Sequence, residues 1–309
     1  MRILIIDEMH NSIVPLLEKL GHAVDYKPEI DRKGIMEVVG GYEGLIIRSK
    51  TKMDRELLEK GGNLKFIARA GAGLDNIDID FLEARGIQLF HAPEGNRDAV
   101  GEHAVGMLLA LFNHYNRSDQ QVRKGIWRRE ENRGEELAGK TVGIIGYGNM
   151  GQSFAKRLSG FGVHVLAYDK YRTDYGDQYA AEAGWEEIFE KADILSLHIP
   201  LTSETRGFLD ITFLGRFQKP IYFINTARGE LISFDTLNEA LQEKIFKGAI
   251  LDVLENEKFG SMTHAQKLSF DKLAERDNVI FSPHVAGWTH QSYEKINKVL
   301  VEKIAKAFP

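Results

Sequence analysis

Residues 141–169 read TVGIIGYGNMGQSFAKRLSGFGVHVLAYD and carry the clearest structural signal in the chain. Short apolar runs predict strands, and the stretch after the glycines has the length of a helix. The segment predicts a strand at Val142–Ile145, followed by a G-x-G-x-x-G turn formed by Gly146, Gly148 and Gly151. It then predicts a helix at Asn149–Phe161 and a second strand at Val163–Tyr168, which ends on the acid Asp169. A glycine turn of this kind is a dinucleotide-binding fingerprint only when a strand precedes it, a helix follows it and an acid stands roughly 20 residues further along the chain. All three conditions are met here.

Each glycine of this turn has its own physical reason. Gly146 permits a tight turn, and Gly148 lets the backbone approach a pyrophosphate with no side chain in the way. Gly151 lets the helix pack close to its strand, and the helix N-terminus faces the negative charge of the phosphates. A glycine-rich turn that binds nothing is the alternative. The context favours a dinucleotide site.

Asp169 predicts which dinucleotide is bound. A carboxylate at the end of the second strand accepts hydrogen bonds from both ribose hydroxyls and repels a 2′-phosphate, which favours NAD over NADP. Lys170 and Arg172 follow directly and would soften that preference.

The composition sets the class of protein. A chain of 309 residues is long enough for two domains, and a net charge of −5 argues against nucleic-acid and anionic-membrane partners. There is no cysteine, which excludes disulfides, thiolate metal sites and a catalytic thiol; we expect no metal. The N-terminus carries four apolar residues before Asp7, too short for a signal peptide, so we expect a cytoplasmic location.

The first 97 residues alternate predicted strands with predicted helices, which indicates a parallel sheet covered on both faces. The strands are Ile3–Ile6, Gly44–Ile47, Phe66–Ala68 and Gln88–Phe90, and the helices are Ser12–Leu20, Ile35–Val39, Asp54–Lys60 and Ile79–Ala84. No glycine fingerprint occurs here. The fold class predicted for the chain is therefore α/β with two doubly wound parallel sheets, one flavodoxin-like and one Rossmann.

Two strand ends in this half carry candidate ligand-binding residues, since ligands bind beyond the carboxyl ends of strands in open α/β sheets. Arg48-Ser49-Lys50-Thr51 follows one strand, and the turn Gly71-Ala72-Gly73, on the way to Asn76, follows the next. Successive backbone N–H groups in such a turn suit an anion. Tight turns with solvated cations are the alternative.

A connecting region follows. Ala92–Asn96 contains Pro and Gly and predicts a loop that acts as a hinge, and Ala99–Asn116 predicts a helix with a rich apolar face. The charged segment from Arg123 to Glu131 carries Trp127, which predicts a subunit contact rather than a simple solvated loop.

The second α/β domain continues from Lys140 with further alternating elements. We expect helices at Trp185–Lys191 and Asp235–Glu243, a final amphipathic helix at Thr289–Phe308, and strands at Ile194–His198, Ile221–Asn225, Gly248–Asp252 and Val279–Ser282.

Three chemically active residues follow strands of this domain: Arg228, Glu257 and His284. A hydroxy acid cannot release a hydride until its hydroxyl proton has an acceptor, and His is the base poised near neutral pH. A carboxylate on the other ring nitrogen fixes the tautomer, and Arg holds a substrate carboxylate with a planar fork. The set suits hydride transfer with a 2-hydroxy or 2-oxo acid.

These motifs, in this order and spacing, resemble the D-isomer-specific 2-hydroxyacid dehydrogenase family over nearly the whole chain, most closely its D-3-phosphoglycerate dehydrogenase branch. The motifs are Gly146–Gly151, Asn225–Gly229, Asp252–Val253 with Glu257, and Ser282–His284. We expect no regulatory C-terminal domain after Pro309, and therefore no serine feedback through one.

The resemblance implies a substrate domain of residues 1–97 plus 289–309 and an NAD-binding domain of residues 98–288. It implies a catalytic Arg228, Glu257 and His284, and a homodimer built through the cofactor domain. It implies a substrate held by Arg48, Ser49, Gly71, Ala72 and Asn76. It implies contacts with NAD from Gly146, Gly148, Asn149, Met150, Gly151, Asp169, Thr226, Ala227, Arg228, Asp252, His284 and Gly287.

Of three interpretations of the reaction, the first is the leading one and the other two are alternatives. Oxidation of 3-phosphoglycerate to 3-phosphohydroxypyruvate, a serine-biosynthesis reaction, is favoured by Arg48, Lys50 and Arg69 as phosphate ligands. Reduction of glyoxylate, hydroxypyruvate or a bulkier 2-oxo acid is favoured by Trp288, where a small residue is common in the family. An NAD-sensing corepressor is the remote third, disfavoured by the intact Arg, Glu and His. Lys258 also departs from the family pattern, in which Pro often follows the catalytic Glu.

Overall fold

The computed structural model describes all residues 1–309, which divide into two compact units. Unit 1 comprises Met1–Arg97 and Trp288–Pro309, and unit 2 comprises Asp98–Gly287. Every strand pairing in both units is parallel, which confirms the predicted fold class of two parallel α/β sheets.

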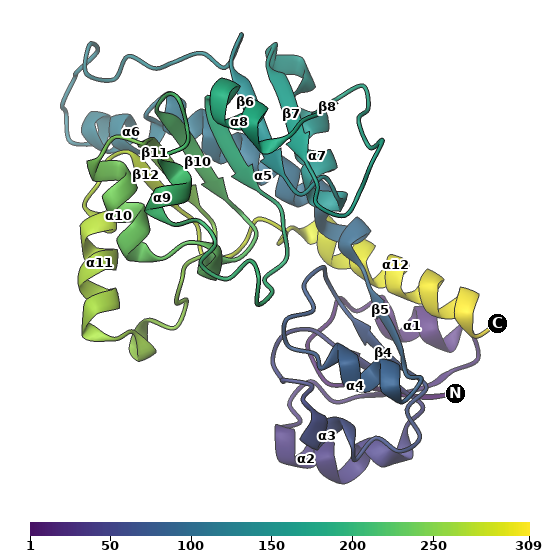
Figure 1. Cartoon of the computed structure of the whole chain (residues 1–309). Helices are drawn as coiled ribbons and strands as arrows, with labels where there is room; N and C mark the ends of the chain where they lie inside the picture. The colour runs from purple at the N-terminus through teal and green to yellow at the C-terminus, as the bar shows by residue number, and fades with distance from the viewer. The chain divides into compact units, whose positions relative to one another are not determined.

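Unit 1 is a five-stranded sheet in the order β2-β1-β3-β4-β5. Its strands are β1 (Arg2–Ile5), β2 (Ala23–Tyr26), β3 (Gly44–Ile47), β4 (Phe66–Arg69) and β5 (Gln88–His91). Its helices are α1 (Ile13–Glu18), α2 (Arg32–Val38), η1 (Val39–Gly41), α3 (Arg55–Leu58), α4 (Ile79–Ala84) and α12 (His290–Ala307). The C-terminal helix α12 packs beside α1 and β5, so the two ends of the chain share this unit (Figure 1).

Unit 2 is a seven-stranded sheet in the order β12-β11-β10-β9-β6-β7-β8. Its strands are β6 (Thr141–Ile145), β7 (His164–Tyr168), β8 (Ala181–Glu182), β9 (Ile194–Leu197), β10 (Ile221–Asn225), β11 (Phe246–Leu251) and β12 (Val279–Phe281). Its helices are α6 (Tyr115–Arg123), α7 (Asn149–Leu158), η2 (Ser159–Phe161), α8 (Trp185–Lys191), α9 (Ile211–Leu214), η3 (Gly229–Leu231), α10 (Phe234–Gln242), η4 (Phe259–Ser261) and α11 (His264–Ala274), joined by most of α5 (Pro93–Phe112).

Neighbouring residues along each strand bury their side chains on opposite faces of the sheet. In unit 2, Leu195 and Phe223 belong to one core cluster, while Ile194 and Ile224 belong to the other. Unit 1 shows the same division into two clusters. Because side chains alternate with a period of two, continuous apolar strands fill a core on each face, as doubly wound sheets require.

The predicted loop at Ala92–Asn96 is wrong, because α5 begins at Pro93. The predicted hinge role of this segment stays a prediction. Proline suits the first position of a helix, where its missing N–H would have no intrahelical partner. Gly95 packs against α12 so closely that a Cβ there would lie 2.6 Å from Ile296 Cα. Lys303 donates to the Glu94 carboxylate and to the His91 carbonyl, which ties this first turn to unit 1.

The predicted helix Ala99–Asn116 is instead two helices. α5 ends at Phe112, His114 adopts a left-handed φ of 52°, and α6 follows from Tyr115. The apolar residues of α5, such as Leu108 and Phe112, are buried in a core cluster of unit 2, so intrachain packing accounts for that rich apolar face.

The sequence prediction omits β2, β8, α6, α9 and α11. Two of these are short strands with exposed residues, which leave a weak pattern. The helix α11 had a usable signal: Thr263 and Gln266 form a reciprocal capping box at its start. No helix is long and apolar enough to cross a membrane.

Candidate active site

The turn from β6 into α7 assigns a separate steric role to each glycine. Gly146 has a φ of +91°, and a Cβ there would lie 2.5 Å from the His198 carbonyl oxygen. A Cβ on Gly151 would lie 2.2 Å from the Gly146 carbonyl oxygen, so this glycine lets α7 pack onto the turn. A Cβ on Gly148, the N-cap of α7, would meet no heavy atom within 4 Å. Gly148 therefore faces space that a ligand can enter.

Asn149 and Met150 form the first turn of α7, directly after that open position. The first backbone N–H groups of an α-helix have no intrahelical partners, and the helix dipole favours an anion there. The glycine turn and the start of α7 together form a cradle for phosphate groups.

Asp169 stands directly after β7 and is held against the glycine turn. Its Oδ2 accepts from the Tyr147 N–H at 2.9 Å, and its Oδ1 accepts from the Tyr171 N–H at 3.0 Å. Each carboxylate oxygen keeps further acceptor capacity for a ribose hydroxyl. Of the two cations beside it, Lys170 pairs with Glu204 at 2.5 Å, and Arg172 donates to the Tyr147 carbonyl.

His198 lies beneath this turn, where its carbonyl approaches Gly146, and its side chain is partly buried. Its Nε2 lies 2.9 Å from Ser196 Oγ, its ring packs on Phe154, and burial lowers its pKa to about 4. Because the unfolded chain binds a proton at about pH 6.5 and the folded chain does not until about pH 4, stability falls as the pH drops through that window.

We therefore expect His198 to contribute about 2–3 kcal/mol of acid destabilisation between pH 7 and pH 4.5. Urea unfolding of wild type and His198→Gln at both pH values measures it: the variant should lose less stability on acidification. His264→Gln, at an exposed position, is the control and should behave as wild type. Equal pH slopes for wild type and His198→Gln would contradict this expectation.

Arg228 lies in a tightly built loop after β10. The buried Asn225 side chain spans this loop, accepting from the Ala227 N–H at 3.0 Å and donating to the Arg228 carbonyl at 2.8 Å. Gly229 lies under the next loop, where a Cβ would come 1.9 Å from the Leu254 carbonyl carbon. The Thr226 hydroxyl in this loop is buried and has no hydrogen-bond partner in the protein.

Glu257 and His284 form a hydrogen-bonded pair. His284 Nδ1 lies 2.9 Å and 3.0 Å from the two Glu257 carboxylate oxygens. Burial acts to raise the pKa of Glu257, but the hydrogen bond and charge of His284, with a further contribution from Arg228, lower it overall. An ionised Glu257 holds the proton on Nδ1, which leaves Nε2 to exchange protons with a substrate.

The turn that carries His284 is anchored on Asp252, directly after β11. The Asp252 carboxylate, 1% exposed, accepts from Ser282 Oγ at 2.5 Å and from the Val285 and Ala286 N–H groups at 2.9 Å each. Its carbonyl accepts from the His284 N–H at 2.8 Å. The bonds of Asp252 are thus made within the protein, to the turn that continues to Gly287.

A family model described as "D-isomer specific 2-hydroxyacid dehydrogenase, NAD binding domain" matches residues 105–286. The chain belongs to this family. The chain is 35% identical over 283 residues to a hydroxypyruvate reductase of Thermotoga maritima, covering 90% of this chain and 88% of that protein. It is 32% identical to D-3-phosphoglycerate dehydrogenase of Archaeoglobus fulgidus, covering 100% of this chain and 58% of that protein. It therefore spans little more than half the length of such phosphoglycerate dehydrogenases.

Among solved structures, D-lactate dehydrogenase from Aquifex aeolicus, complexed with NAD and lactic acid, superimposes with a TM-score of 0.82 at 29% identity. The match covers 100% of this chain and 95% of that one. The protein is thus an NAD-binding dehydrogenase of the D-2-hydroxyacid family. Its own residues fit the dinucleotide, because Gly148 opens onto free space and the buried Thr226 hydroxyl lacks a partner.

Unit 1 of this family member holds the residues predicted to bind substrate. Arg48 is partly buried, with its guanidinium carbon 4.1 Å from the Trp288 ring centroid and 5.1 Å from that of Tyr293. Its N–H donates to Asp7 at 2.7 Å, which fixes the start of the loop, and Ser49 follows on the surface. Asn76 donates to the Arg48 and Thr51 carbonyls, so its amide supports this loop.

The second predicted substrate-binding turn follows β4. Gly71 has a φ of +139°, and a Cβ there would lie 1.8 Å from an Arg69 guanidinium nitrogen, so the arginine lies across this glycine. The Gly71 carbonyl accepts from the Ala92 N–H at 2.9 Å, and the Ala72 carbonyl is 3.0 Å from His91 Nδ1. The turn is thus anchored to β5 and the residue that follows it.

Sequence reasoning missed the residues that support the reactive ones. The sequence motifs include Asn225 and Ser282 without predicting a role for either, and no motif contains His103 on α5. The signal that could have found Asn225 is a polar residue at the end of an apolar strand, three positions before the candidate Arg228. No such signal exists for His103, because its partner Ser282 lies 179 positions further along the chain.

Proposed function

We propose that the protein reduces a small unphosphorylated 2-oxo acid, of the hydroxypyruvate or glyoxylate class, to the D-2-hydroxy acid with NADH. The His284–Glu257 pair in an NAD-binding unit is the observation that supports the reaction. The engagement of Lys50 inside unit 1 supports the choice of substrate.

Bound NADH supplies the hydride that reduces the substrate C2 carbonyl. His284, as imidazolium, gives the Nε2 proton to the carbonyl oxygen as charge develops there, and takes it back in the reverse direction. Glu257 stabilises the imidazolium and holds the ring in place. Arg228 holds the substrate carboxylate and polarises the carbonyl with its planar fork. Asp252 anchors the turn that presents His284.

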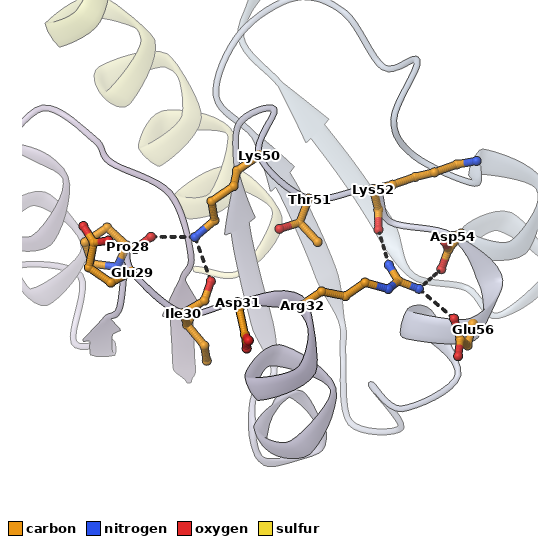
Figure 2. A pocket seen from close by; sticks show the side chains of 10 residues that line it. All are labelled: Pro28, Glu29, Ile30, Asp31, Arg32, Lys50, Thr51, Lys52, Asp54 and Glu56. Carbon is orange, nitrogen blue, oxygen red and sulfur yellow. Dashed lines mark hydrogen bonds and ion pairs between the residues drawn. The ribbon is translucent and has the colours of Figure 1, made fainter. Parts of the chain in front are cut away.

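Of the groups predicted to bind a phosphate, Lys50 is engaged by carbonyl groups of unit 1. Lys50 lines a pocket of about 620 Å³. Its Nζ donates to the Pro28 and Ile30 carbonyls at 2.5 and 2.8 Å, and both bonds can be followed in Figure 2. Arg32 in the same pocket pairs with Asp54 and Glu56. An adjoining pocket of about 400 Å³ is lined by the cations Arg48 and Lys50, by Trp288, and by the acids Asp7, Glu8 and Glu29.

These acids would oppose a doubly charged phosphate, and Trp288, 59% exposed, offers an apolar wall beside Arg48. The second candidate is 3-phosphohydroxypyruvate, favoured by the positive charge of the partly buried Arg48 guanidinium, whose Nη1 also donates to the Glu8 carbonyl at 3.2 Å. Placement in serine biosynthesis and a cytoplasmic location stay predictions, as do the substrate contacts of Ser49, Gly71, Ala72 and Asn76.

The test is the loss of NADH absorbance with purified protein and a panel of 2-oxo acids: hydroxypyruvate, glyoxylate, pyruvate and 3-phosphohydroxypyruvate. We expect kcat/KM to be highest for an unphosphorylated acid. A clear preference for the phosphorylated acid would replace this proposal by the second candidate, and no turnover with any of them would remove both.

Asp169→Ala is expected to relax the preference for NADH over NADPH by about tenfold or more, since it removes the charge that repels a 2′-phosphate. The ratio of kcat/KM for the two cofactors measures this effect. The exposed Asp174→Ala, in the loop that follows, is the matched control and should leave the ratio unchanged. An unchanged ratio in Asp169→Ala would mean that another residue recognises the ribose.

We propose, finally, that the protein forms a homodimer through the region around α6. Trp127 is 77% exposed there, and Tyr115, Val122 and Ile126 are exposed as well, which is an unusual set of apolar side chains for a solvated surface. Sedimentation equilibrium at micromolar concentration should give twice the chain mass of 34.9 kDa; a single-chain mass would overturn the proposal.

A further inference from the structure

The turn that carries His284 adopts a backbone conformation that needs external support. His284 has a φ of 55°, in the left-handed region that is unfavourable for a non-glycine residue. The side chain and carbonyl of Asp252 hold this turn through bonds to Ser282, His284, Val285 and Ala286. The placement of the His284 ring therefore depends on how the Asp252 carboxylate is oriented.

Side chains of helix α5 contact Ser282, the residue whose hydroxyl is hydrogen-bonded to the Asp252 carboxylate. Ser282 Oγ lies 2.5 Å from Asp252 Oδ1, 3.3 Å from Met107 Sδ and 2.9 Å from His103 Nε2. A hydroxyl has one proton, and an ionised carboxylate accepts it more strongly than a thioether does. Ser282 thus donates to Asp252, and its own lone pair accepts from the Nε2–H of His103.

His103 also lies close to the carboxylate itself. Its Nε2 is 3.6 Å from Asp252 Oδ1, and its side chain is one quarter exposed whereas that of Asp252 is 1% exposed. A carboxylate buried to this degree needs several donors around it to offset the loss of water. The dipole of the His103 N–H adds to the two backbone amides and the hydroxyl that already point at Asp252.

We infer that His103 is a positioning residue for the acid–base chemistry of unit 2. Its Nε2–H fixes the Ser282 hydroxyl, the hydroxyl fixes the Asp252 carboxylate, and the carboxylate fixes the turn that presents His284. This inference rests on the proposed role of His284 as the proton donor. The contacts of His103 are with Ser282 and Asp252, so it acts on His284 through these residues and not directly on the reacting atoms.

Two substitutions separate a donor from a space-filling role. His103→Leu fills similar volume without an N–H, whereas His103→Gln restores an N–H donor at similar reach. We expect His103→Leu to lower kcat about 10- to 100-fold, because a displacement of about 1 Å at a reacting group has that effect. The Kd for NADH should stay within about twofold, and His103→Gln should keep kcat within about threefold of wild type.

Amide hydrogen exchange gives a readout that needs no turnover. The Val285 and Ala286 amides should exchange faster in His103→Leu than in wild type, and at the wild-type rate in His103→Gln. Gly106→Ala, an exposed position on the same helix with no heavy atom near its Cβ, is the control for general effects on α5.

The outcomes are distinguishable. Wild-type kcat and exchange in His103→Leu, or equal losses in both His103 variants, would overturn the positioning role. Wild-type protein that reduces no 2-oxo acid would instead overturn the proposed function, and the exchange comparison would still decide whether His103 orders the 282–286 turn.

Discussion

His284→Asn is expected to lower kcat for 2-oxo acid reduction by about 10²- to 10⁴-fold while the Kd for NADH stays within about twofold. The imidazole is the group that can give a proton to the developing alkoxide at neutral pH, and Asn cannot replace it. Asn is the right substitution because it tolerates the left-handed φ of 55° at this position, so the turn is preserved. Single-turnover reduction under saturating NADH, with NADH fluorescence for binding, measures both quantities.

The exposed His264→Asn is the matched control, since it removes an imidazole from the start of α11 without touching the site. Glu257→Gln should show a smaller loss than His284→Asn, because the ring stays in place but its imidazolium form is no longer stabilised by an ionised carboxylate. Full activity in His284→Asn would remove this residue from the mechanism and leave the His284–Glu257 pair with a structural role.

Gly148→Ala is expected to weaken NADH binding without loss of stability, whereas Gly151→Ala is expected to lower the stability of unit 2. A Cβ on Gly148 meets no protein atom, so the variant should fold with wild-type stability yet bind NADH at least tenfold more weakly, because the methyl group occupies the path of the pyrophosphate. A Cβ on Gly151 would lie 2.2 Å from the Gly146 carbonyl oxygen, so α7 must shift away from β6. That overpacking should cost about 1–3 kcal/mol or more of unfolding free energy.

Thermal unfolding without cofactor and NADH titration by fluorescence separate the two effects. Gly160→Ala is the control, because this glycine also has open space at its Cβ but lies at the far end of α7, in η2. It should change neither stability nor affinity appreciably. Wild-type NADH affinity in Gly148→Ala would mean that the cofactor does not approach this glycine. An unchanged melting temperature in Gly151→Ala would mean that the helix can move at little cost.

The catalytic candidates were predictable from the sequence because ligands bind beyond the carboxyl ends of parallel strands. Arg228, Glu257 and His284 were selected because they follow strands of one parallel sheet, and the structure brings the last two into direct contact. The same reasoning predicts a phosphate ligand at Lys50, which in the structure donates to two backbone carbonyls; its role toward a phosphate stays a prediction. The sequence shows the positive charge of Lys50 but not its hydrogen-bond partners, because the carbonyl groups that it contacts belong to a segment some 20 residues earlier in the chain.

The sequence by itself determined the features that depend on short-range sterics and periodicity. The glycine spacing from Gly146 to Gly151 defines the turn, because only glycine suits a φ of +91° or a 2.2 Å approach. Apolar runs of strand length, separated by helices, determined two parallel sheets with a core on each face.

Tertiary structure alone decided how distant polar groups meet. The His103–Ser282–Asp252 chain joins α5 to the ends of two strands, and the Arg48 guanidinium stacks on Trp288, 240 positions further along the chain. Likewise, Pro93 and Gly95 belong to the first turn of a helix rather than to a loop, and α12 packs closely against Gly95. Hydrogen bonds and close packing act over a few ångströms in space, so their partners emerge only when the folded backbone brings those positions together.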